Sequence, residues 1–170
     1  MARINKSAGV ASRPNPGIWK AMIPDQFEKG GEQLDGVITT NDSGDLLRDK
    51  NGDEMWKLRC VIVDEHPKAP RDVVVFANIS FGGKSAAKTN ALFKAVGAYD
   101  GLGEDDDVMP AHIQNKPFAL VTEIGDKGYL ETSGFACFMN ASEAPVLHKR
   151  GGGAVPGAAA AATATPKLPF

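Results

Sequence analysis

A glycine-rich stretch with a lysine and a serine is the first candidate for ligand chemistry. The run Phe81-Gly82-Gly83-Lys84-Ser85 lies between a predicted strand and a predicted helix, as a phosphate-binding loop does. The pattern G-x-x-x-x-G-K-[ST], however, requires glycine at the position that Asn78 occupies. We therefore interpret the two glycines as a strand-to-helix turn and Ser85 as the helix N-cap.

Patterns for metal binding and catalysis are incomplete. Asp49, Asn51 and Asp53 alternate as calcium ligands do, but the EF-hand register puts Leu47 at the first ligand position and no glutamate at the twelfth. A hairpin turn explains this stretch better, and the acidic run at residues 104–107 is typical of a solvated loop. The cysteines and histidines follow no ligand spacing, and no nucleophile is paired with a base. We predict that the protein is not an enzyme and uses no metal or cofactor.

Cations and aromatic side chains on two neighbouring strands indicate a different chemistry. Single-stranded nucleic acid is bound by cations along its phosphates and by aromatic rings under its bases. Lys57 and Arg59 share the outward face of one predicted strand, and Phe76 is outward on the next. The predicted nucleic-acid-binding residues are Arg48, Lys50, Trp56, Lys57, Arg59, Lys68, Arg71, Phe76, Lys127 and Tyr129.

Four of these residues also have a simpler interpretation. Trp56 alternates in phase with Leu58 and Ile62, which favours the core over a stacking platform. Phe76 can instead belong to a second small core under the N-terminal segment, and Lys57 and Arg59 can belong to an ordinary solvated strand face.

Period-two alternation dominates the chain and predicts the elements that must position these residues. The order is three strands, one short helix and two strands, which is that of the OB-fold. We predict a mostly β protein, a five-stranded OB-fold-like small barrel. The expected strands are residues 34–40, 55–63, 73–81, 116–124 and 129–139, and the helix runs from the Ser85 cap to Gly97.

Composition sets the domain organisation. The 170 residues are 42% hydrophobic and 24% charged, enough for one globular domain, which we place at residues 18–146. Residues 1–17 read as a flexible basic arm, and residues 147–170 as a disordered Gly/Ala/Pro-rich tail. Both ends are basic and the middle is acidic, for a net charge of −2. We find no membrane span or signal peptide and expect a cytoplasmic protein.

Four short motifs along the domain form a recognisable series. They are Asn51-Gly52-Asp53-Glu54-Met55-Trp56-Lys57-Leu58, Phe76-Ala77-Asn78-Ile79-Ser80, Ala91-Leu92-Phe93-Lys94-Ala95-Val96-Gly97 and Asn115-Lys116-Pro117-Phe118. With these motifs, residues 34–139 resemble the bacteriophage-encoded single-stranded DNA-binding proteins of OB-fold type. This resemblance implies a protein that coats and protects exposed single strands in phage DNA replication or recombination, in the host bacterial cytoplasm. The chain departs from the family at Pro70-Arg71-Asp72, where a Gly-Arg or Gly-Lys pair is usual.

The tail and two other function classes complete the expectations. The tail is similar to that of bacterial single-stranded DNA-binding proteins, which implies that Phe170 docks replication or recombination proteins, although Lys167 replaces the usual acidic residues. One alternative is a phage structural or assembly module built on a small β-barrel. The other is an accessory subunit of a nucleic-acid enzyme. An oligomer is possible, and no membrane partner is expected.

Overall fold

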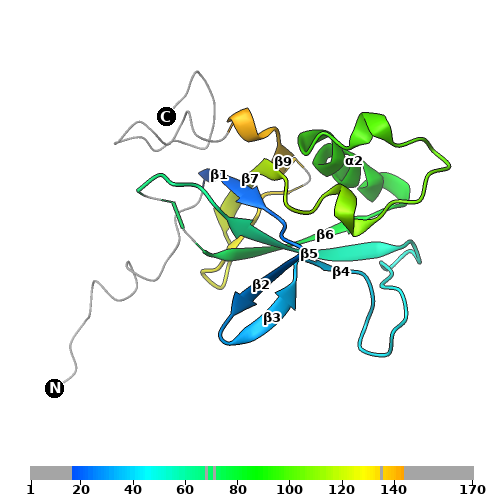
Figure 1. Cartoon of the computed structure of the whole chain (residues 1–170), viewed down its shortest axis with the longest axis horizontal. Coiled ribbons are helices and arrows are strands. Elements are labelled where there is room, and N and C mark those ends of the chain that lie inside the picture. The colour runs from blue at the N-terminus through cyan, green and yellow to red at the C-terminus, as the bar shows by residue number, and fades with distance from the viewer. Residues whose placement is uncertain (1–16, 68, 71, 135, 144–170) are drawn as a thin grey trace.

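Strand β5 (Met55–Ile62) is the centre of a seven-stranded sheet in the computed structural model (Figure 1), which describes residues 17–67, 69–70, 72–134 and 136–143. One edge of β5 pairs with β6 (Val74–Ser80). The other edge pairs with β4 (Val37–Ile38) near the start of β5 and with β1 (Gly17–Met22) near its end. Both long strands predicted around the outward cations and Phe76 are therefore confirmed, and they are direct antiparallel neighbours.

Strand β7 (Pro117–Ile124) extends the sheet on the far side of β1. Its other edge pairs with β8 (Leu130–Thr132) and β9 (Phe138–Met139). Cα atoms of β8 come within 8 Å of β6, but no ladder joins these two strands in the described part of the chain. The mostly β class with one short helix is confirmed. The paired strands form a continuous sheet, and among the described residues no ladder closes it into a barrel.

The N-terminal strand β1 was not predicted, and none of its residues is exposed. Trp19 is 1% exposed and Ala21 is fully buried, because β1 lies between β5 and β7. Six strands therefore precede the helix, rather than three. Trp19, Ala21 and Ile23 alternate on the buried face, but three positions are too weak a pattern to predict a strand by themselves.

The predicted strand at residues 34–40 is wrong, because the chain breaks at Gly36. Strands β2 (Gln26–Lys29) and β3 (Glu32–Asp35) form a separate hairpin, and β4 follows after Gly36. A Cβ atom on Gly36 would lie 1.8 Å from the carbonyl oxygen of Pro24. Only glycine permits this close approach of two backbone segments. In Figure 1 the β2–β3 hairpin projects below the strands, on the side opposite the helix.

The last predicted strand, residues 129–139, is also interrupted. It is divided into β8 and β9 by residues 133–137. Two backbone hydrogen bonds hold the interruption to β7, because Ser133 donates to Val121 and Val121 donates to Cys137. Gly134 takes a φ of +64°, a conformation that suits glycine, so the chain bulges away from the ladder here.

Helix α2 (Ala86–Ala95) lies on the side of the sheet away from the β2–β3 hairpin, as Figure 1 shows. Its Thr89, Leu92 and Phe93 are buried. Ser85 does precede the helix, but its side chain makes no capping hydrogen bond, because a 3₁₀ turn (η1, Gly83–Ser85) leads into α2. Instead, the Thr89 hydroxyl donates to the carbonyl oxygen of Ser80 at 2.5 Å and ties α2 to the end of β6.

Helix α2 ends at Ala95, and short 3₁₀ turns occur in the chain after it. Gly97 ends α2 with a φ of +80°. None of the helices in the described ranges has the length and apolar character to span a bilayer. The remaining 3₁₀ turns are η2 (Tyr99–Gly101), η3 (Pro110–His112) and η4 (Ala141–Glu143).

Candidate nucleic-acid interface

Four side chains from β5 and β6 form the outer face, which we define as Lys57, Arg59, Phe76 and Asn78. The register pairs Lys57 with Asn78 and Arg59 with Phe76. Backbone bonds at both ends of the ladder, Phe81 to Glu54 and Ile62 to Val73, show that these two pairs occupy non-hydrogen-bonded positions. Side chains come closest at such positions. The predicted cations and aromatic ring are therefore immediate neighbours.

Phe76 is the exposed aromatic ring of this face. It is 67% exposed, although its strand neighbours Val75 and Ala77 are buried in the core. The alternative for Phe76, a second small core under the N-terminal segment, involves residues 1–16, which lie outside the described residues. A phenyl ring left in water at the middle of a strand is available to a ligand.

Trp56 lies in the core, so its inclusion among the binding residues is corrected. Its side chain is 2% exposed and its ring packs edge-on against Phe81, with 4.7 Å between ring centroids. The indole N–H donates to Glu54 Oε2 at 3.2 Å. Trp56 alternates with Leu58 on the buried face of β5, so no base can stack on it in this structure.

The two cations of the outer face differ in their hydrogen bonding. Lys57 is exposed and makes no hydrogen bond or ion pair within the described ranges. Arg59 donates from Nη1 to the carbonyl oxygen of Asp35 at 2.7 Å, and its backbone N–H donates to Gly36 at 2.8 Å. Arg59 thus fixes the base of the β2–β3 hairpin beside the outer face, with further guanidinium donors left over.

A turn bounds the outer face where β5 begins and β6 ends. Met55 pairs with Ser80, and the Ser80 hydroxyl donates to Asp49 Oδ2 at 2.5 Å. This hydrogen bond, with backbone donors from Asn51 and Asp53, holds the pKa of Asp49 below its usual range. The turn predicted at Asp49 is confirmed, and its carboxylate serves the turn itself.

Basic residues of this turn lie at the edge of the outer face. Lys50 is exposed at the turn. Arg48 is exposed too, but its Nη1 donates to the carbonyl oxygen of Gly52 at 3.0 Å. Both are placed to extend a positive edge, with Lys50 the freer of the two.

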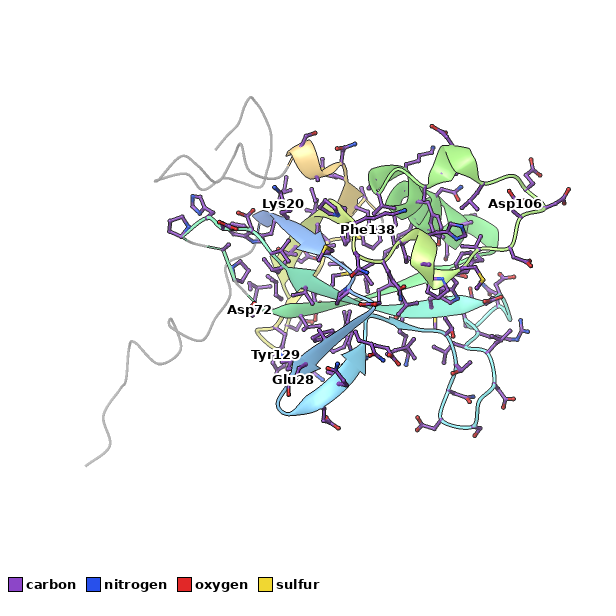
Figure 2. All side chains as sticks on the ribbon, in the orientation of Figure 1. Lys20, Glu28, Asp72, Asp106, Tyr129 and Phe138 are labelled. Atoms are coloured by element: carbon purple, nitrogen blue, oxygen red, sulfur yellow. The ribbon has the colours of Figure 1, made fainter. Side chains whose placement is uncertain are left out.

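A second exposed aromatic ring lies on the hairpin between β7 and β8. Tyr129 is 70% exposed, and its carbonyl oxygen accepts the N–H of Gly125 at 2.8 Å. Lys127 is exposed at the same turn. Figure 2 shows Tyr129 on the side of the sheet away from α2, the side on which Glu28 of β2 also lies. Lys68, Arg71 and Phe170 lie outside the described residues, as do residues 1–16 of the predicted arm and the whole predicted tail, residues 147–170. Gly17, the last residue of the predicted arm, is instead the first residue of β1.

Asn78 is the member of the outer face that sequence reasoning did not select. It is exposed, opposite Lys57, and two residues from Phe76 on the same face of β6. Its signal was the period-two spacing from Phe76. An amide both donates and accepts hydrogen bonds, which suits the edge of a nucleobase.

The glycine turn after β6 has the wrong charge for a phosphate loop. A Cβ atom on Gly82 would lie 2.2 Å from Cγ of Asp53, so that carboxylate packs directly against the turn. A negative group in this position repels phosphate. The strand-to-helix turn is confirmed.

The cysteines also lack the features of a reactive site. Cys60 and Cys137 are free, buried thiols, and burial raises the pKa of both. Across the described ranges, no three His, Cys, Asp or Glu side chains are grouped to hold a metal ion.

Comparison with known proteins identifies no family for this chain. The sequence matches no protein-family model, and it shows no significant similarity to a curated protein.

Proposed function

We propose that this protein binds single-stranded DNA through the outer face, largely without sequence specificity. The observation that carries the proposal is Phe76, 67% exposed at mid-strand and paired directly with Arg59. An aromatic ring gives any base a surface to stack on, worth about 1 to 3 kcal/mol per base, and adjacent cations neutralise phosphates. No carboxylate belongs to the four side chains of this face.

The fold supports the proposal through the position of these strands. In an OB-fold, the second and third strands carry the oligonucleotide-binding face and the helix lies between the third and fourth strands. Here α2 follows β6 and precedes β7, and the outer face is on β5 and β6. We propose an OB-fold in which β5 and β6 are the second and third strands, with β2–β3 as an added hairpin.

The biological role follows from the family resemblance. A protein of this kind coats and protects exposed single strands in phage replication or recombination, inside the host bacterial cytoplasm. Phe170, at the end of the tail, is the proposed contact for replication or recombination proteins.

Salt dependence of one charge substitution tests the proposal. Each phosphate contact to a single strand contributes a slope of roughly −0.7 to log K against log salt. Lys57→Gln should reduce the slope for labelled oligo-dT by about that amount. Lys94→Gln is the matched control, because Lys94 is on α2, beyond the opposite side of the sheet. Equal slopes for Lys57→Gln, Lys94→Gln and the unmodified protein would reject the outer face as the phosphate site.

A protein-interaction module is the second candidate, and one observation favours it. Two largely exposed aromatic rings, Phe76 and Tyr129, also suit a protein partner, since aromatic residues are enriched in protein interfaces. Such a module, whether for phage assembly or as a subunit of a nucleic-acid enzyme, would not bind free oligonucleotide with a steep salt dependence.

A further inference from the structure

The outer face is chemically divided between its two strands. Strand β5 contributes the two cations, Lys57 and Arg59, and β6 contributes the aromatic ring of Phe76 and the amide of Asn78. Cations bind phosphates, whereas a ring and an amide bind bases. The boundary between the cations and the base-binding groups runs parallel to the two strands, because each cation on β5 pairs with a base-binding residue on β6.

From this division, we propose an orientation for the bound strand, an inference that rests on the proposed function. The phosphodiester backbone follows β5, and the bases extend over β6. Phe76 stacks under one base, and Asn78 bonds the edge of a base.

The surroundings of the two strands agree with this orientation. Beyond β6 lies β8, which approaches β6 within 8 Å and is preceded directly by the exposed Tyr129. A second stacking ring is therefore on the β6 side. Beyond β5 lie β4 and the base of the β2–β3 hairpin, where Arg59 contacts the Asp35 carbonyl oxygen.

Carboxylates at the margins of the outer face limit the length of the path that phosphates can follow. Asp35 is an acidic residue on the β5 side, and its carboxylate accepts a hydrogen bond from the Gln26 amide at 3.1 Å. Asp49 closes the other end through Ser80. The path for phosphates is therefore short, and the sequence-independent electrostatic part of binding should come from few contacts.

Two modified oligonucleotides separate backbone from base contacts. An abasic strand keeps the phosphates and removes the bases, and it is compared with oligo-dT of the same length. Phe76→Leu should weaken oligo-dT binding by about fivefold or more and leave abasic binding unchanged, because stacking of one base is worth at least about 1 kcal/mol. Lys57→Gln should weaken both strands by a similar factor.

Matched controls lie on the other side of the sheet. Tyr99→Leu removes a partly exposed ring next to α2, and Lys94→Gln removes a charge from α2, so neither should change either affinity. Phe76 and Lys57 are exposed, so their substitution should leave the fold intact. Thermal unfolding of each variant checks this.

The outcomes distinguish the orientation from the function. If Phe76→Leu weakens abasic and oligo-dT binding equally, or Lys57→Gln weakens oligo-dT alone, the proposed orientation is overturned while single-strand binding stands. If the unmodified protein binds neither strand, the proposed function fails and the orientation with it.

Discussion

Replacing Gly36 by alanine should destabilise the fold and loosen the outer face together. The backbone of Gly36 is outside the left-handed region, so alanine can adopt its conformation, and only the space is missing. A Cβ atom there would lie 1.8 Å from the Pro24 carbonyl oxygen, so the two segments must separate by about 1.5 Å to reach ordinary contact. Overpacking of this kind costs about 1 to 3 kcal/mol.

Two backbone hydrogen bonds depend on the same position and raise the cost. Gly36 donates to Asp25 at 3.2 Å and accepts from Arg59 at 2.8 Å. Weakening them adds about 1 to 2 kcal/mol, since a hydrogen bond contributes about 0.5 to 1.5 kcal/mol net. The total of about 2 to 5 kcal/mol corresponds to a fall in Tm on the order of 10 °C.

Thermal unfolding followed by circular dichroism measures this loss, with Gly44→Ala as the control. Gly44 has a φ of +87° and open space around it, so alanine there meets only conformational strain, about 1 to 2 kcal/mol. Gly36→Ala should therefore be the less stable variant. A Gly36→Ala protein with unchanged Tm would refute the close approach of Gly36 to Pro24.

Three further predictions concern single side chains. Trp56→Ala should cost about 3 to 5 kcal/mol in urea unfolding, whereas Phe76→Ala should cost less than about 1 kcal/mol; equal losses would mean that the two rings are placed wrongly. Because the pKa of Asp49 is lowered on folding, its contribution to stability is present above the usual carboxyl pKa and is lost as pH falls through the lowered one. The stability gap between the unmodified protein and Asp49→Asn should thus shrink below about pH 4, and a gap that stays constant would contradict this assignment. Cys60 and Cys137 should resist a thiol reagent in the native state and react after unfolding; fast native labelling would contradict their burial.

The sequence was sufficient to predict which side chains point outward where one face of a strand is fully buried. In β5 and β6, each core residue is two positions from the next, so the outward positions of Lys57, Arg59 and Phe76 followed directly. Three of the four side chains of the outer face could therefore be predicted before any pairing was known, and Asn78 was missed.

Features that depend on contacts between distant segments could not be predicted. Strand β1 is buried only because β5 and β7 flank it, and its six residues carry too weak a pattern alone. The break at Gly36 is set by the Pro24 carbonyl, and the engagement of Arg59 by the Asp35 carbonyl. Neither neighbour can be identified from spacing along the chain.

The most direct test of the central claim is the binding of the unmodified protein to labelled oligo-dT and to a duplex of equal length, by fluorescence anisotropy. A labelled strand is the better reporter, because Trp19 and Trp56 are both buried. Titrations at about 50 mM and about 200 mM salt give the electrostatic part. We predict tighter binding to oligo-dT than to the duplex, weakened by salt. Equal affinity for both nucleic acids, or no binding to oligo-dT at the lower salt, would contradict a single-strand-binding function.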